Sequence, residues 1–190
     1  MIKYPNFVDV KNIKCTGSNG YRFSLYIPFN RGGKVLCVIM KNPSTASKLN
    51  ADYTISKVCN VAFNNGYSSV MVYNLFPFRS TKSNGLITFM SMGSYSKIMK
   101  VNLNIIANGC KNRDTVFAWG TNTISSSKRI STLYDNAIKD VISIVSSQTF
   151  FVDRCKCAKY TTPCKNVIHS MVRYPLHGLR WHNISRLIIY

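Results

Sequence analysis

The chain has 190 residues, of which 46% are apolar and 12% aromatic, a composition that fits one globular domain and excludes a disordered chain. Its 25 Lys and Arg residues outnumber its 6 acids and give a formal net charge of +19. All the acids are Asp, and so few carboxylates argue against two-metal nucleases and paired-carboxylate glycosidases, which need several converging acids.

The N-terminal stretch, residues 1–33, has the pattern of a strand pair. Apolar residues alternate with Arg22, Ser24 and Tyr26 over residues 21–27, directly after a turn at residues 17–20. Val35–Met40 then forms a continuous apolar run, which predicts a strand covered on both faces. It is the longest such run and far too short to span a membrane.

Strand and helix patterns alternate through the rest of the chain. Helical spacing over residues 55–63, with Asp52 near its start, is followed by a strand at 69–74, a long loop and a helix over 95–108 closed by Gly109. A strand at 115–119, a helix over 133–142 and a strand at 149–152 complete the pattern. This alternation predicts a three-layer αβα sandwich with a mostly parallel sheet, as one domain over 1–190 whose core spans 34–190.

The charge excess predicts a polyanionic partner, and DNA fits best. The basic residues are spread along the chain, which favours a folded basic face over a disordered arm. An acidic membrane surface, or a basic surface without any such partner, is the alternative. No signal-peptide pattern opens the sequence, so we expect a cytoplasmic monomer that does not contact membranes.

Seven cysteines, an odd number in a chain without a signal peptide, are expected to be reduced thiols. Cys155, Cys157 and Cys164, followed by His169, have ligand types that suit zinc. The gap between the first two is shorter than in usual zinc sites, so we expect no metal and no cofactor.

Polar loops follow three of the predicted strands, at residues 42–45, 74–79 and 118–121. Ligands of open α/β sheets bind beyond the carboxyl ends of the strands, so these loops are expected to converge on one pocket.

Motifs on these loops and at two other places in the chain resemble a bacterial and phage domain family of uncharacterised function. They are an N-P-S-T-A box at residues 42–46, a G-Y pair at 66–67, an N-L-F-x-x-R-S-T box at 74–81, an A-W-G box at 118–120 and a P-L pair at 175–176. The resemblance extends from Val35 to His177, and the boxes together are more specific than any one alone.

That family is in turn similar to the uracil-DNA glycosylase superfamily. Its water-positioning loop resembles Lys41-Asn42-Pro43, and its strand ending in a base-reading Asn resembles Val72-Tyr73-Asn74. The place of its H-P-S loop falls on residues 174–180. Two departures stand out. Tyr174 replaces the first His of that loop, and Ser44 stands where the best-known branch has a bulky aromatic residue that excludes thymine.

The resemblance implies a metal-independent enzyme that hydrolyses the N-glycosidic bond of uracil in DNA. Asn42 would position water, Asn74 would read the uracil edge, and His177 or Tyr174 would stabilise the departing uracil anion. Ser44 and Phe76 would contact the base, with Phe78, Tyr53 and Trp119 as further stacking candidates. An apolar and basic cluster would hold the base out of the duplex, and two cations would contact phosphates. The cluster is Leu176, Leu179 and Arg180, and the cations are Arg79 and Lys82.

Each of these residues also has an ordinary structural interpretation. Asn42 can be a turn residue before Pro43, Asn74 can bond its own backbone, and the aromatic residues can pack in the core. Two other functions therefore remain open. One is a non-catalytic DNA-binding module on a glycosylase-like scaffold, and the other is an enzyme acting on a free nucleotide or a modified nucleoside.

Overall fold

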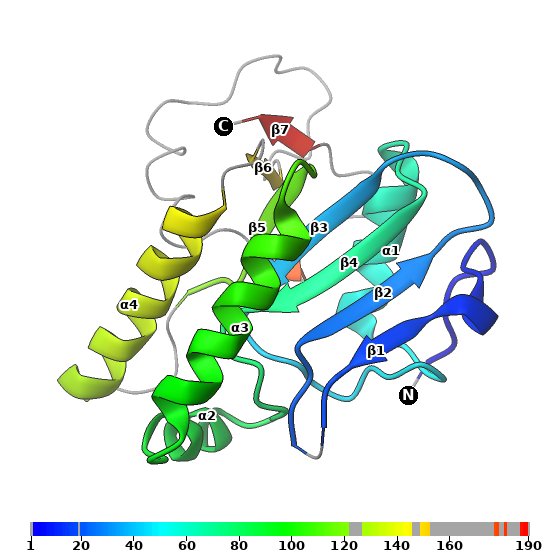
Figure 1. The fold of residues 1–190 in the computed structure, drawn as a ribbon. Helices are drawn as coiled ribbons and strands as arrows, with labels where there is room; N and C mark the ends of the chain where they lie inside the picture. Colours follow the sequence, from blue (N-terminus) through cyan, green and yellow to red (C-terminus); the bar gives the residue numbers. More distant parts are fainter. Residues whose placement is uncertain are drawn as a thin grey trace.

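The computed structural model describes residues 2–18, 20–121, 127–145, 149–152, 177–178, 181 and 187–189. These residues form a mixed α/β fold, in which a mostly parallel sheet carries helices on both faces (Figure 1). The predicted α/β class is therefore confirmed. Within the described residues, no helix is long and apolar enough to cross a membrane.

The sheet has the strand order β1-β2-β4-β3-β5-β6-β7. The strands are β1 (Lys14–Thr16), β2 (Ser24–Pro28), β3 (Val35–Met40), β4 (Ser69–Asn74), β5 (Thr115–Ala118), β6 (Thr149–Val152) and β7 (Leu187–Ile189). The four central strands, β4, β3, β5 and β6, run parallel to one another. The outer strands pair antiparallel, with β1 and β2 on one side and β7 on the other.

The predicted N-terminal strand pair is present as the β1–β2 hairpin, and it extends the main sheet because β2 pairs with β4. The alternating pattern predicts a strand from Tyr21, but β2 begins at Ser24. Tyr21 instead makes an isolated bridge to Phe78 in the loop after β4. This pairing joins the hairpin to the carboxyl end of the sheet.

The helices divide between the two faces. Helix α1 (Tyr53–Asn64) covers one face, and α2 (Ser83–Met90), α3 (Tyr95–Cys110) and α4 (Lys128–Ile144) cover the other (Figure 1). Each face has its own cluster of buried apolar side chains. As the sequence indicates, Asp52 precedes α1, where its Oδ1 accepts a hydrogen bond of 2.8 Å from the Ile55 amide.

Two details differ from the predicted elements. Helix α2 lies within the stretch predicted as a long loop, because its eight residues are too few to show a clear helical period. Gly109 was predicted to end α3, but the helix continues to Cys110. The glycine is needed for space, since a Cβ there would lie 1.7 Å from the Tyr73 hydroxyl oxygen.

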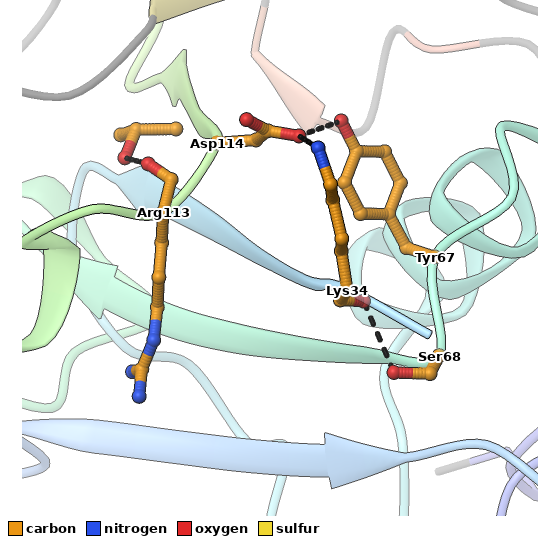
Figure 2. A network of polar contacts seen from close by, with 6 residues as sticks. Lys34, Tyr67, Ser68, Arg113 and Asp114 are labelled. Carbon is orange, nitrogen blue, oxygen red and sulfur yellow. Dashed lines mark hydrogen bonds and ion pairs between the residues drawn. The ribbon is translucent and has the colours of Figure 1, made fainter. Parts of the chain in front are cut away.

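A polar network closes the amino end of the parallel strands (Figure 2). The Tyr67 hydroxyl donates a hydrogen bond of 3.0 Å to Asp114, and Lys34 Nζ lies 4.0 Å from the same carboxylate oxygen. Lys34 is 82% exposed, so its ion pair contributes little. Burial, and then the hydrogen bond to Asp114, raise the pKa of Tyr67 above its ordinary value. The neutral hydroxyl is therefore the form that the fold favours.

Replacing Tyr67 by Phe should lower the free energy of unfolding by about 1 kcal/mol at neutral pH, because one buried hydrogen bond is lost. The raised pKa also means that Tyr67 stabilises the fold below pH 10, the ordinary tyrosine value, and that this contribution declines as pH rises above 10. Urea denaturation at pH 8 and pH 10.5 should show a smaller decline for Tyr67→Phe than for the parent chain. Tyr26→Phe, which removes the hydroxyl of a half-buried tyrosine, is the control, and equal declines in all three proteins would contradict the assignment.

Candidate functional site

The carboxyl ends of β3, β4 and β5 are aligned in one row. Met40, the last residue of β3, pairs with Asn74 on one side and Ala118 on the other. From β3 the chain passes through α1 to β4, and then through α2 and α3 on the opposite face to β5 (Figure 1). The strand order reverses beside β3, which is where open α/β sheets bind their ligands.

Backbone hydrogen bonds hold the loops after β3 and β4 together. The Leu75 amide donates to Met40 (2.7 Å), the Phe76 amide to Lys41 (3.0 Å) and the Ser80 amide to Pro43 (3.0 Å). These bonds continue the parallel pairing past the ends of both strands. Two of the predicted polar loops, those at 42–45 and 74–79, therefore do converge.

Asn42 ties the same two loops with its side chain. Its Nδ2 donates to the Ser80 carbonyl at 2.6 Å and to the Pro43 carbonyl at 3.1 Å. In the described part of the chain, the carbonyl oxygen Oδ1 accepts no hydrogen bond. The amide nitrogen is thus used for structure, and the oxygen is the atom that is left to orient a ligand or a water.

Asn74 is the least satisfied polar side chain at this edge. It is completely buried, and neither its Nδ2 nor its Oδ1 has a hydrogen-bond partner among the described residues. Alternation along β4 places it on the α1 face, with Val70 and Val72. Each buried polar group left unbonded costs about 1–3 kcal/mol, so this amide weakens the fold unless a ligand pairs with it.

Asn102 supports Asn74 from the opposite face, although no sequence motif singled it out. Its Nδ2 donates to the backbone carbonyls of Asn74 (2.9 Å) and Leu75 (3.2 Å). In the sequence, Asn102 is a polar residue within the apolar stripe of α3 that includes Met99 and Ile106, a pattern that indicates a buried polar side chain. Asn102 fixes the backbone at the point where β4 ends.

His177 returns to this edge from the far end of the sequence. It is half-buried beside Gly120, where a Cβ would lie 3.0 Å from the His177 Cβ. Gly120 also has a φ of +73°, a conformation that favours glycine. Gly178, the residue after His177, lies against Met40 and α1. A Cβ at Gly178 would lie 3.7 Å from the Met40 Cε and 3.1 Å from Val58. His177 thus lies beside the loop after β5, and the residue that follows it, Gly178, lies close to Met40 at the end of β3.

Lys41 places a cation at the point where the strand order reverses, a role that its place in the 41–43 motif did not indicate. Its Nζ donates to the Thr121 carbonyl at 2.7 Å and lies 5.7 Å from the centre of the Tyr134 ring. Burial lowers the pKa of Lys41 below its ordinary value. The side chain links the loop after β3 to the loop after β5.

The aromatic stacking candidates are mostly in the core. Phe76 and Trp119 are completely buried, and the Phe76 ring packs 5.6 Å from the Tyr134 ring. Phe78 stacks on Phe89 with a centroid distance of 5.4 Å. These contacts favour packing over base binding. Tyr53, by contrast, is 70% exposed at the start of α1.

Ser44, Arg79 and Lys82 line one surface cleft of about 440 Å³. Arg79 donates to the Ser44 carbonyl, at 3.3 Å, and so crosses from the loop after β4 to the loop after β3. The predicted phosphate contacts and one predicted base contact therefore share a cleft.

Several predicted site residues lie outside the described residues. They are Tyr174, Leu176, Leu179 and Arg180, together with the possible zinc ligands Cys155, Cys157, Cys164 and His169. Within the described ranges, no three His, Cys, Asp or Glu side chains gather as a metal site would require.

Comparison with known proteins identifies one family. A family model described as a protein of unknown function, DUF1643, matches residues 22–164. The match begins at Arg22 in the β1–β2 hairpin region and ends before residues 174–180. No curated protein and no solved structure shows significant similarity to the chain.

The unpaired Asn74 amide leads to a prediction about stability. Asn74→Leu removes two unbonded polar atoms and keeps a similar volume, so the free energy of unfolding should rise by about 1 kcal/mol or more. Asn102→Leu is the matched control, because it removes two hydrogen bonds made by Nδ2, although the Asn102 Oδ1 is also unbonded, and it should lower that free energy. Chemical denaturation measures both. A loss of stability in Asn74→Leu equal to that in Asn102→Leu would show that the Asn74 amide is structural.

Proposed function

The chain belongs to the DUF1643 family, and we propose that this member is a DNA glycosylase that removes uracil and leaves an abasic site. The observation that carries the proposal is the buried Asn74 amide, which has no partner in the described residues and stands at the carboxyl edge of the sheet. The resemblance of residues 41–43, 72–74 and 174–180 to the uracil-DNA glycosylase superfamily supports it.

Asn74 has the hydrogen-bonding groups that uracil requires. Its Oδ1 can accept from uracil N3–H while its Nδ2 donates to O4. Cytosine presents a donor at N4 and an acceptor at N3, and would leave one contact mismatched in a desolvated site. A base flipped out of the stack exposes this Watson–Crick edge. The amide therefore suits uracil better than cytosine.

In the proposed reaction, water attacks C1′ as the bond from C1′ to N1 breaks, and the electron pair leaves with uracil as an N1 anion. The transition state resembles an oxocarbenium ion next to that anion. Asn42 Oδ1 orients the water, and a neutral amide suits positioning better than proton abstraction. The water loses its proton to solvent as the bond to C1′ forms. His177 or Tyr174 donates a hydrogen bond to the charge that develops on uracil O2.

The protein's charge supports DNA as the substrate. Net charge +19 attracts a polyanion, and Lys41, Arg79 and Lys82 all lie on the loops that surround Asn42. A small nucleotide does not need such an excess. We propose that the protein acts as a cytoplasmic monomer and needs no cofactor for this reaction.

One observation favours a second function, a DNA-binding module without catalysis. Asn74 exposes none of its surface, so a base would have to displace neighbouring groups to reach it. Tyr174 in place of the expected His also favours the non-catalytic function. The two functions differ in whether uracil is released.

A direct assay separates the candidates. The protein is incubated in EDTA with single- and double-stranded oligonucleotides that contain one uracil, followed by alkali to cleave abasic sites. Strand scission at uracil supports the glycosylase. Tight binding without scission supports the binding module. The absence of both scission and binding would favour an enzyme that acts on a free nucleotide.

Asn74→Ala should reduce uracil excision more than tenfold, a loss of about 1.4 kcal/mol or more of transition-state stabilisation. DNA affinity should remain nearly unchanged, because phosphate contacts dominate binding. Asn74→Asp should also excise less uracil, since its carboxylate repels O4, and any new activity should be on cytosine. Asn104→Ala on the exposed side of α3 is the control and should retain parental excision. Parental excision by Asn74→Ala would place the base elsewhere.

DNA binding should weaken steeply as salt increases, because each phosphate contact releases counterions. A plot of log K against log salt should have a slope of about −3 to −6 for a face with several Lys and Arg contacts. Fluorescence anisotropy with a labelled oligonucleotide measures this slope. Binding that does not respond to salt would contradict DNA as the polyanionic partner.

A further inference from the structure

We propose that the cleft between the loops after β3 and β4 binds one phosphodiester group of a nucleic acid chain. The proposed function supplies the identity of the polymer, but the cleft itself is defined by its charge and shape. Its ligand could be bound without any base being removed. Phosphodiester binding and uracil excision can therefore be tested separately.

The lining of the cleft suits an anion. It combines a guanidinium, an ammonium, hydroxyl groups and one amide, in a cavity of about 440 Å³. No acidic residue is among the lining residues, which are Ser44, Arg79, Ser80, Thr81, Lys82, Asn84 and Gly85. Cations and hydroxyls are the side chains that contact phosphate oxygens in nucleic acid complexes.

Two arginines meet beside this cleft, and neither forms a salt bridge in the described part of the chain. Arg22 Nη1 and Arg79 Nη1 donate to the same carbonyl, that of Ala46, at 3.1 and 3.3 Å. Arg22 is only 2% exposed, and its Nε has no partner among the described residues. In the described part of the chain, the salt bridge is that of Lys34 with Asp114, which lies at the opposite end of the strands from these arginines. A bound anion would reduce the repulsion between the two guanidinium groups.

The proximity of the two guanidinium groups affects the pKa of Arg22. Burial, and then the charge of Arg79, lower the pKa of the Arg22 guanidinium to about 10. The charged form still dominates at neutral pH, so the fold holds two close positive charges under physiological conditions. An anion in the cleft would stabilise both.

The loop at residues 80–85 has a tight, fixed shape. Ser80 Oγ accepts from the Lys82 amide (3.2 Å) and donates to the Lys82 carbonyl (2.5 Å), which also accepts from the Gly85 amide (3.1 Å). A Cβ at Gly85 would lie 2.2 Å from Ser80 Oγ, so only glycine fits. The start of α2 directly follows Lys82, and its positive end adds to the attraction for an anion.

The cleft is joined to the proposed base site by Asn42. The Asn42 Nδ2 bond to the Ser80 carbonyl connects the two loops at 2.6 Å. A phosphodiester held by Arg79 and Lys82 would thus belong to a nucleotide close to the one whose base reaches Asn74. This arrangement favours a polymer, whose phosphates adjoin the target base, over a free mononucleotide.

The test measures binding of a uracil-free, fluorescently labelled single-stranded oligonucleotide at several salt concentrations. Lys82→Gln should bind at least threefold more weakly, with the salt slope reduced by about 0.7, because one phosphate contact is lost. Lys82→Arg should restore most of the affinity. Lys100→Gln, which removes an exposed charge from α3, should change affinity less than twofold. Equal effects of Lys82→Gln and Lys100→Gln would overturn the proposal.

Competition identifies the form of the phosphate. Inorganic phosphate and deoxyuridine monophosphate should compete only weakly with the oligonucleotide for the parent protein, and less still for Lys82→Gln. A mononucleotide that competes as well as an unlabelled oligonucleotide would assign the cleft to a terminal phosphate and overturn the phosphodiester. Since none of the oligonucleotides contains uracil, a lack of excision activity has no effect on these results.

Discussion

The parallel pairing of β3 with β4 and β5 is the constraint on which the candidate site depends. It aligns Met40 with Asn74 and Ala118, and so brings three loops from distant parts of the chain to one edge. Backbone bonds continue this pairing beyond the strands, from Leu75 to Met40 and from Phe76 to Lys41. The backbone hydrogen bonds of the sheet therefore also fix the positions of these loops.

The polar groups at this edge are arranged at a cost in stability. Asn74 is buried without a hydrogen-bond partner in the described residues, where Arg22 and Arg79 share one carbonyl and form no salt bridge. An apolar residue in place of Asn74 would favour folding. Groups of this kind are expected where a ligand completes the bonding, and here an amide and two cations suit a base and a phosphate.

The opposite end of the strands shows the contrast. There the Tyr67 hydroxyl donates a hydrogen bond to the Asp114 carboxylate, and the exposed Lys34 lies 4.0 Å from the same carboxylate, as Figure 2 shows. Few acids are available in a chain with 6 Asp residues, and one of them is placed at the amino edge of the sheet. Because none lines the cleft at the carboxyl edge, positive charge at that edge is left for a polyanion.

The sequence by itself determined the α/β class, the main strands and the positions of Asn42 and Asn74 at strand ends, because apolar periodicity and strand length are local properties. Tertiary structure alone decided which polar atoms are satisfied. Asn42 uses its nitrogen for Ser80, Asn102 holds the end of β4, and Phe76 packs in the core. Helix α2 was also missed, since a short helix shows little period. Hydrogen bonds and burial depend on residues far apart in the chain, and no local pattern records them.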